Sequence, residues 1–263
     1  MLRASFDEDA ELYDRVRPRY PEALFDALVL LSRLPSGGRV LEIGCGTGQA
    51  TLPLAARGHE VTCVELGANM ATVARRNLRE FPGVSIEVGA FEEWTAPGEP
   101  YDVVLAATCW HWIDPEVRFR KVASVLRPGG ALALVGTAHV SDGGGDVFFT
   151  RAHEVYLRCE PATAGEWVAP PAVEAVPPPE VDMELFLPPA FRAYRRVASY
   201  DARGYVDVLH TYSGHRTLPA ERRRCLYGGI ARLIDAEFGG RIDKHYLFTL
   251  AVARRLDRPQ PRL

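Results

Sequence analysis

The stretch that decides the fold is Val40-Leu41-Glu42-Ile43-Gly44-Cys45-Gly46-Thr47-Gly48, which joins an apolar strand, one acidic residue and a G-x-G-x-G turn with no polar loop between them. Glycines at alternate positions lack a Cβ, so the backbone can turn sharply and approach a ligand closely. A dinucleotide site requires G-x-G-x-x-G, with the pyrophosphate on the helix N-terminus. Here position 49 is Gln, and Glu42 precedes the first glycine by two residues. The stretch therefore predicts a nucleotide-like ligand that carries an amine or a cation and no phosphate.

Glu65 supplies a second acidic group. It ends the apolar strand Val61–Val64 and lies 21 residues after Gly44, at the place where a carboxylate accepts both hydroxyls of a ribose. Adenosine with a cationic amino-acid tail in place of phosphates is S-adenosylmethionine. At these residues the chain closely resembles the class I S-adenosylmethionine-dependent methyltransferases, and the resemblance runs from about residue 6 to residue 253. The alternative is a degenerate Rossmann domain.

Strand and helix patterns alternate along the rest of the chain. Strands are expected at 40–43, 61–65, 84–88, 101–107 and 131–135, and helices at 21–34, 49–57, 69–81 and 116–126. Such alternation gives a parallel sheet covered on both faces. Two later strands, at 191–200 and 244–253, match the antiparallel edge of the resembled family. The predicted fold class is α/β: a doubly wound, seven-stranded, mostly parallel Rossmann-like sheet with an antiparallel edge strand and a cap insertion.

The segment 141–190 breaks the alternation with runs of glycine and proline such as Gly143-Gly144-Gly145 and Pro177-Pro178-Pro179. Such a segment is expected to form a cap or lid rather than a separate domain. The predicted organisation is a methyltransferase domain at 1–140 and 191–263, with a cap insertion at 141–190.

Composition narrows the class of protein. The 31 Lys and Arg residues against 34 Asp and Glu give a net charge of −3, and 47% of residues are apolar. The chain lacks the excess of basic residues that would indicate a nucleic-acid partner. It also has no apolar run long enough to indicate a membrane span or a signal region. We therefore expect a cytoplasmic enzyme that binds neither nucleic acid nor a membrane. The five cysteines are odd in number and form no C-x-x-C pair, which argues against a disulfide framework and against a metal site.

Residues at the carboxyl ends of the predicted strands should converge on the cosubstrate, because ligands of such sheets bind there. The resemblance adds an N-terminal segment that folds over the methionine end, where Arg17 would pair with the carboxylate and a tyrosine would face the sulfonium. The alternative is a solvated arm whose aromatic residues only pack on the sheet. The resemblance also adds a stretch after the third strand, where Phe91 would flank the adenine, while Glu92 is either a ligand contact or an ordinary helix-start carboxylate. The predicted residues for binding S-adenosyl-L-methionine are Tyr13, Arg17, Tyr20, Glu42, Gly44, Cys45, Gly46, Thr47, Gly48, Glu65, Leu66, Met70, Ala90, Phe91, Glu92, Thr108 and Cys109.

The fourth strand leads into Trp110-His111-Trp112. The acidic or amide residue and two prolines of nucleobase amino-methyltransferases are absent here. The His-Trp pair instead resembles a group of small-molecule methyltransferases that includes the trans-aconitate methyltransferases. With an ordinary pKa near 6.5, His111 is the candidate catalytic base, unless His111 and the two tryptophans only form a pocket wall. The predicted acceptor-binding residues are Trp110, Trp112, Tyr212 and Ser213, although the last two could instead only fix a helix end.

The predicted function is transfer of the methyl group of S-adenosyl-L-methionine to a small organic molecule, at an oxygen of a carboxylate or a hydroxyl. The protein would mainly align acceptor, methyl and sulfur and exclude water, which can supply about 7–11 kcal/mol in favourable cases. Two alternatives stay open: a nucleic-acid or protein methyltransferase, and a cosubstrate-binding module without catalytic activity.

Overall fold

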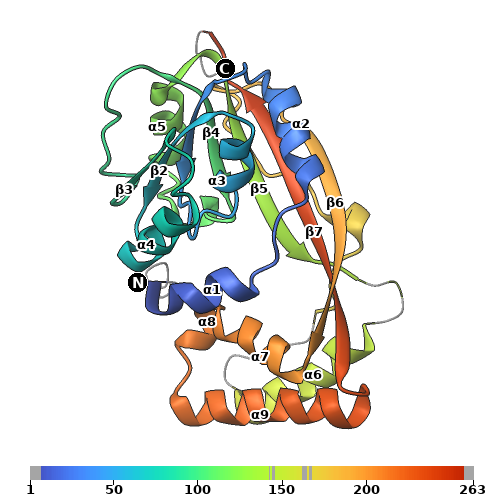
Figure 1. Cartoon of the computed structure of the whole chain (residues 1–263). Helices are drawn as coiled ribbons and strands as arrows, with labels where there is room; N and C mark the ends of the chain where they lie inside the picture. Colours follow the sequence, from blue (N-terminus) through green and yellow to red (C-terminus); the bar gives the residue numbers. More distant parts are fainter. Residues whose placement is uncertain (1–6, 142, 144–145, 162–164, 166–167, 258–263) are drawn as a thin grey trace. The chain divides into compact units, whose positions relative to one another are not determined.

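A seven-stranded sheet of order β3-β2-β1-β4-β5-β7-β6 organises the chain (Figure 1). The computed structural model describes residues 7–257 except 142, 144–145, 162–164 and 166–167. The strands β1 to β5 pair in parallel, and β7 is antiparallel. The predicted fold class is therefore confirmed. The strands are β1 (Arg39–Ile43), β2 (Glu60–Glu65), β3 (Val84–Val88), β4 (Tyr101–Ala107), β5 (Leu126–His139), β6 (Ala190–Asp201) and β7 (Arg241–Arg254).

The helices between the first strands lie at the predicted positions with slightly different ends. They are α2 (Glu22–Ser32), α3 (Thr51–Ala56), α4 (Ala68–Asn77) and α5 (Arg118–Val125). The largest difference is β5, which begins directly after α5 at Leu126, whereas the glycines of Arg127-Pro128-Gly129-Gly130 indicated a turn before a strand at 131–135. The paired β4 absorbs this extension through a register shift between Tyr101 and Val103.

The chain divides into two compact units, which we describe separately. The sheet unit comprises residues 19–137, 178–194 and 248–263, and the helical unit comprises residues 1–18, 138–177 and 195–247. In the sheet unit β1 and β4 are almost continuously buried, as expected for parallel strands covered on both faces. The edge strand β3 alternates between exposed and half-buried residues.

The strand register explains why the predicted site residues come together in the sheet unit. Ile43, the last residue of β1, pairs with Val64 of β2 and with Ala106 of β4. Gly44 and Thr108, which follow β1 and β4, and Glu65, the last residue of β2, therefore lie at the same edge of the sheet.

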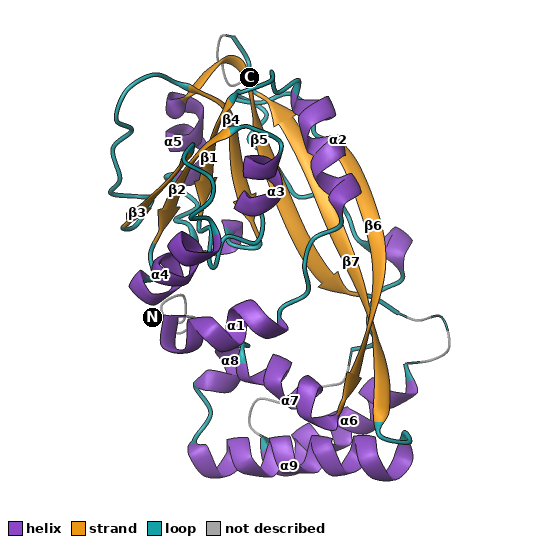
Figure 2. Cartoon of the chain, in the orientation of Figure 1, coloured by secondary structure: helices purple, strands orange, loops and turns teal. Residues whose placement is uncertain are grey.

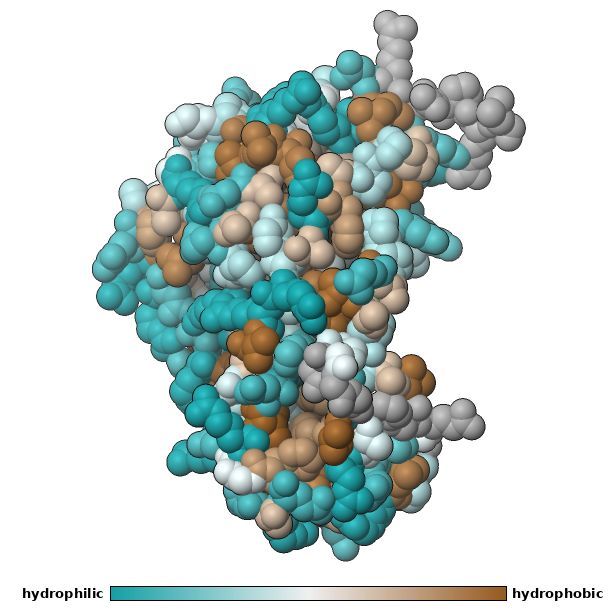
Figure 3. Space-filling view, turned by 90° about the vertical axis from the view of Figure 1, so that its right-hand side faces the viewer, coloured by the Kyte–Doolittle hydropathy of each residue, from teal (hydrophilic) through white to brown (hydrophobic). Residues whose placement is uncertain are grey.

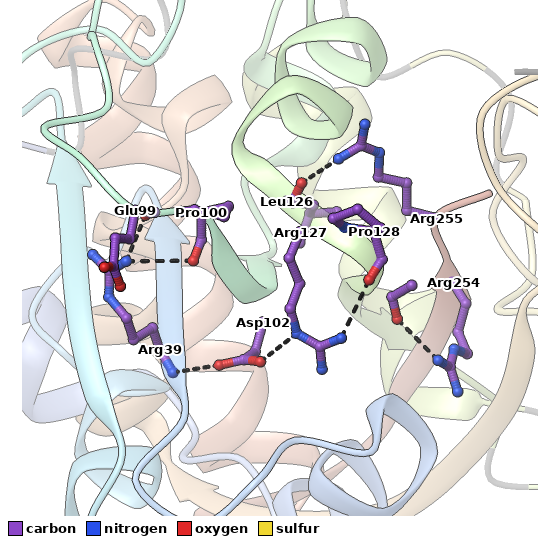
Figure 4. A network of polar contacts seen from close by, with 10 residues as sticks. Arg39, Glu99, Pro100, Asp102, Leu126, Arg127, Pro128, Arg254 and Arg255 are labelled. Atoms are coloured by element: carbon purple, nitrogen blue, oxygen red, sulfur yellow. Dashed lines mark hydrogen bonds and ion pairs between the residues drawn. The ribbon is translucent and has the colours of Figure 1, made fainter. Parts of the chain in front are cut away.

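The opposite edge of the sheet unit carries a polar network that holds the strand beginnings together (Figure 4). Asp102 accepts hydrogen bonds from the backbone N–H of Arg39 at 2.8 Å and from Nε of Arg127 at 2.6 Å, and so links β1, β4 and β5. Arg254 donates to the carbonyl of Gly129 at 3.0 Å, and Arg255 donates to the carbonyl of Leu126. Arg127, Arg254 and Arg255 are therefore bound to protein groups and stabilise this edge of the sheet.

The helical unit contains α1 (Ala10–Val16), α6 (Val147–Cys159), α7 (Ala202–His210), α8 (Ser213–Arg216) and α9 (Ala220–Glu237) (Figure 2). An apolar cluster fixes α6 against α9, and its members include Phe148, Val155, Leu226 and Ile230. A Cβ at Gly229 would lie 2.5 Å from Cγ1 of Val155, so a glycine lets the two helices approach closely.

A disulfide between Cys159 and Cys225 also joins α6 to α9. The sequence-based argument against disulfides was therefore wrong on this point. An odd cysteine count leaves room for one pair, and a separation of 66 residues has no recognisable spacing. Disulfides are typical of oxidising compartments, so the pair does not support the predicted cytoplasmic location, which stays a prediction.

On the face drawn in Figure 3, hydrophobic residues are scattered among hydrophilic ones. Within the described part of the chain, no helix has the length and apolar composition needed to cross a bilayer.

Candidate cosubstrate site and neighbouring residues

The glycine turn after β1 has the backbone conformation that its sequence requires. Gly44, Gly46 and Gly48 have φ values of 65°, 57° and 87°, in the left-handed region that favours glycine. The N–H of Gly44 donates to the carbonyl of Val64 at 2.8 Å, and the N–H of Gly48 donates to the carbonyl of Cys45 at 2.9 Å. The turn is therefore closed by its own hydrogen bonds and fixed to β2.

Gly44 also lies too close to the loop after β4 to carry a side chain, because an added Cβ would be 2.9 Å from the Cβ of Cys109. We expect Gly44→Ala to lower the free energy of unfolding by about 2–4 kcal/mol, combining a left-handed backbone cost of about 1–2 kcal/mol with the overpacking. Gly37→Ala is the matched control, since Gly37 has a φ of 68° but nothing within 4 Å of the added Cβ. Urea denaturation of both variants measures the difference, and equal losses would contradict the close-packing explanation.

Glu65 holds the glycine turn from the end of β2. Its Oε2 accepts the N–H of Gly46 at 2.8 Å, and its Oε1 accepts the N–H of Gly67 at 2.8 Å. Gly67 is the N-cap residue of α4. A carboxylate oxygen can accept more than one hydrogen bond, so the predicted bonds to ribose hydroxyls are compatible with these contacts and stay a prediction.

Glu42 lies beneath the turn and is only 1% exposed. Its Oε2 accepts the hydroxyl of Thr51 at 2.7 Å. Burial raises the pKa of Glu42 to about 7, the Thr51 hydrogen bond opposes this rise, and the nearby Glu65 adds to it. The residue is deeper than its sequence position indicated, so it would act on a ligand cation mainly through its field.

Two buried polar atoms beside the turn are unsatisfied. Oγ1 of Thr47 and Nε2 of Gln49 have no hydrogen-bond partner among the described residues. Buried polar groups nearly always have a partner, so these atoms fit a polar ligand over the turn. The residues present therefore match an adenosyl ligand with a positively charged tail.

The stretch after β3 only partly matches its predicted role. Ala90 is half-buried beside the strand end, but Phe91 is 3% exposed and packs against Trp94 with ring centroids 6.4 Å apart. Little of the Phe91 ring is left to flank an adenine. Oε1 of Glu92 accepts the N–H of Asp114 at 3.3 Å, a structural contact. Of the predicted residues after β2, Met70 is buried and Leu66 is 38% exposed.

Thr108, after β4, has a φ of 58°, which is unusual for a residue other than glycine. Its N–H donates to the carbonyl of Val135, and its Oγ1 lies 3.4 Å from the hydroxyl of Tyr20. Sγ of the next residue, Cys109, donates to the carbonyl of Ile43 at 2.8 Å. Burial raises the pKa of the Cys109 thiol well above its ordinary value, and Glu42 and Glu65 add to this rise, so the thiol is protonated near neutral pH. Strained backbone often occurs at functional sites.

The short helix η2 (Trp110–Trp112) presents His111 as an exposed side chain, 4.7 Å from the ring of Trp112. Loss of hydration to neighbouring protein atoms, followed by the charge of Arg118, lowers the pKa of His111. A lowered pKa keeps the imidazole neutral near pH 7, as a general base requires. Nε1 of Trp110 is buried and has no hydrogen-bond partner within the described ranges.

The remaining predicted residues lie in the helical unit. Tyr13 and Arg17 belong to α1 and its C-cap, with the Arg17 guanidinium 5.0 Å from the Tyr13 ring. Tyr212 is the N-cap residue of α8 and Ser213 is its first residue. Because Tyr20 belongs to the sheet unit, the predicted N-terminal segment is divided between the two units.

Two buried polar residues were missed from the sequence, Thr51 in the sheet unit and Lys244 in the helical unit. The hydroxyl of Thr51 donates a hydrogen bond to Glu42, and Thr51 is the first residue of α3. Nothing in the sequence pattern indicated this contact. Lys244 of β7 is 5% exposed. The sequence did contain a signal for Lys244, since at a spacing of two residues it shares the buried side of the strand with the apolar residues Ile242 and Tyr246.

Comparisons with known proteins agree with this geometry. Residues 40–130 match the family model of a methyltransferase domain. An uncharacterized methyltransferase of Mycobacterium tuberculosis is 40% identical over 135 residues, which are 51% of this chain and 52% of the relative. The ubiquinone biosynthesis O-methyltransferase of Xanthomonas axonopodis is 35% identical over 104 residues, 38% of this chain and 43% of the relative. The tRNA 5-carboxymethoxyuridine methyltransferase of Escherichia coli is 35% identical over 113 residues, 41% of this chain and 43% of the relative.

A solved structure of a putative type II methyltransferase from Anaeromyxobacter dehalogenans is similar over more of the chain. It is 25% identical, covers 93% of this chain and 99% of its own, and gives a TM-score of 0.54. The chain spans about half the length of the curated relatives that it matches. The chain therefore contains a methyltransferase domain, and S-adenosyl-L-methionine is the cosubstrate of this type of domain.

Proposed function

We propose that the chain transfers the methyl group of S-adenosyl-L-methionine to an oxygen of a small organic acceptor. The observation that carries the proposal is the pair of carboxylates, Glu42 and Glu65, on either side of a glycine turn in the left-handed conformation. This arrangement suits a ligand with a ribose and a positive charge and offers nothing to neutralise a phosphate.

Several residues of the sheet unit would bind the cosubstrate. Glu65 would accept the ribose hydroxyls while it holds the turn, Ala90 would contact the adenine, and Thr47 would bind through its unsatisfied hydroxyl. The bound cosubstrate supplies a sulfonium, which is an activated leaving group. The protein then has to orient the acceptor oxygen and exclude water, and His111 would take the proton of a hydroxyl acceptor.

Support for a small acceptor comes from the net charge of −3 and from the His111-Trp112 pair, which resembles that of small-molecule methyltransferases such as the trans-aconitate group. The relative named as an O-methyltransferase of ubiquinone biosynthesis favours oxygen. The relative named for tRNA 5-carboxymethoxyuridine favours the second candidate, a methyltransferase acting on RNA. An RNA substrate requires basic groups for the phosphate backbone, which the charge balance does not favour.

Labelled S-adenosylmethionine offered with pooled organic acids, phenols, amines and, separately, tRNA tests the proposal. We expect label in the organic acid or phenol pools. Label found only in tRNA would establish the second candidate, and no transfer to any pool, with S-adenosylhomocysteine bound, would favour a binding module. A protein that binds NAD or ATP but not S-adenosylhomocysteine would overturn the proposal entirely.

The role of His111 gives a separate prediction. With a hydroxyl acceptor, His111→Ala should lower kcat by about 10²–10⁴-fold, the usual contribution of a general base, and leave S-adenosylhomocysteine affinity unchanged within twofold. A carboxylate acceptor is already ionised, so its kcat should change little. His153→Ala, in α6 of the helical unit, is the control. Full retention of kcat with a hydroxyl acceptor would leave His111 as a pocket wall only.

A further inference from the structure

Lys244 and Arg17, two cations of the helical unit, lie against the same tyrosine. Nζ of Lys244 donates to the hydroxyl of Tyr212 at 2.8 Å, and the Arg17 guanidinium carbon lies 4.8 Å from the centre of the Tyr212 ring. Lys244 is 5% exposed. The Nε atom of Arg17 is buried and has no hydrogen-bond partner in the described part of the chain, while its Nη2 donates to the carbonyl of Thr211 at 2.9 Å.

Neither cation has a carboxylate partner among the described residues. Other arginines of this unit do have one: Arg151 pairs with Glu154 and Glu237, and Arg222 pairs with Glu160. Lys244 instead lies 5.2–6.0 Å from the centres of four aromatic rings, those of Phe149, Tyr205, Tyr212 and Tyr246. Ring faces attract a cation but replace only part of its lost hydration.

The electrostatic environment of the Tyr212 hydroxyl is consistent with this excess of positive charge. Burial on its own would raise the pKa of Tyr212, but Lys244 and then Arg17 lower it below its ordinary value. The neighbouring Tyr205 shows the opposite shift, since burial raises its pKa. A negative charge placed beside the Tyr212 hydroxyl is therefore stabilised.

We propose that Lys244, Arg17 and Tyr212 form a binding site for the carboxylate of an organic ligand. A buried, uncompensated cation is costly unless an anion joins it. Lys244 has two further N–H donors and Arg17 has its Nε–H, which would hold the two oxygens of a carboxylate. The surrounding aromatic rings would cover an apolar body of the ligand. The site lies within the helical unit, and its ligand is an organic acid. Under the proposed function, the amino-acid carboxylate of the cosubstrate is a second source of the same chemistry.

Calorimetry with phenylacetate and its neutral counterpart phenylacetamide, on the full chain with and without S-adenosylhomocysteine, tests the site. We expect phenylacetate to bind at least tenfold more tightly than phenylacetamide. Lys244→Met, which keeps the side-chain length and removes the charge, should weaken phenylacetate binding at least tenfold. Arg17→Met at the half-buried position should act in the same direction. Arg151→Met is the matched control and should leave binding unchanged within twofold.

S-Adenosylhomocysteine and 5′-methylthioadenosine, which lacks the amino-acid carboxylate, distinguish the two sources. If Lys244→Met weakens only phenylacetate, the site binds the carboxylate of a separate organic acid. If it weakens S-adenosylhomocysteine and spares methylthioadenosine, the site stands and holds the cosubstrate carboxylate. Folded Lys244→Met and Arg17→Met proteins that bind all of these ligands like wild type would overturn the site, as would wild-type protein that does not distinguish phenylacetate from its amide. Failure of wild type to bind S-adenosylhomocysteine contradicts the proposed function instead.

Discussion

Glu65→Gln should weaken the binding of S-adenosylhomocysteine at least a hundredfold, although the substitution keeps the size and shape of the side chain. Both carboxylate oxygens of Glu65 accept a backbone N–H, from Gly46 at 2.8 Å and from Gly67 at 2.8 Å. A glutamine has only one acceptor oxygen, so its NH₂ group would face one of these N–H donors. An unpaired buried N–H costs about 1–3 kcal/mol, and the turn would move to avoid that cost.

The loss at Glu65 has a second component on the ligand side. Both ribose hydroxyls would donate to a carboxylate, and a hydrogen bond to a charged group contributes about 1.5–3 kcal/mol. Together the two losses amount to about 2.5–6 kcal/mol, and roughly 2.7 kcal/mol corresponds to a hundredfold change.

Isothermal titration calorimetry with S-adenosylhomocysteine measures the effect of Glu65→Gln. Glu60→Gln is the control, because Glu60 begins the same strand and its side chain is 67% exposed. Glu60→Gln should bind like wild type. Wild-type affinity in Glu65→Gln would show that Glu65 neither shapes the turn nor contacts the ribose.

The sheet could be predicted from the sequence because its signals are local and repeated. β1 and β4 are short apolar runs, and the glycine turn after β1 identifies the ligand-binding edge without any long-range information. The start of β5 at Leu126 was not predicted, because Leu126 pairs with the distant Tyr101 of β4, while the continuous pairing with β4 resumes only at Ala131, after Pro128 and Gly129.

The site was less predictable, because side-chain direction depends on packing between distant segments. Phe91 follows the correct strand, but its ring packs against Trp94 in the core. Lys244 is a polar residue on the buried side of a strand, and its neighbours Arg17 and Tyr212 are far away in sequence. The Cys159–Cys225 disulfide was missed for the same reason, since only the packing of α6 on α9 brings the two cysteines together.

Glu42→Gln should make the protein more stable and a weaker binder of its cosubstrate at pH 8. The pKa of Glu42 is raised from 4.5 to about 7 in the folded protein. Below pH 4.5 the carboxyl is protonated in both the folded and the unfolded states and contributes no difference. Between pH 4.5 and 7 the unfolded chain ionises first, so the free energy of unfolding falls as the pH rises. Above pH 7 the whole penalty is present, about 3 kcal/mol for this shift.

Glutamine at position 42 does not ionise, and its carbonyl oxygen can still accept the Thr51 hydroxyl. Urea denaturation should therefore find Glu42→Gln more stable than wild type by about 3 kcal/mol at pH 8, with a much smaller gain at pH 5. A positively charged ligand favours the ionised carboxylate, so the wild-type affinity for S-adenosylmethionine, whose sulfonium carries the charge, should rise about tenfold between pH 6 and pH 8, whereas the affinity for the uncharged thioether S-adenosylhomocysteine should change less. In Glu42→Gln the affinity should be lower at pH 8 and nearly independent of pH. The buried charge of Glu42 thus lowers the stability of the protein while it attracts the ligand cation. If Glu42→Gln gained stability and kept the wild-type affinity at pH 8, a role for Glu42 in attracting the ligand cation would be contradicted.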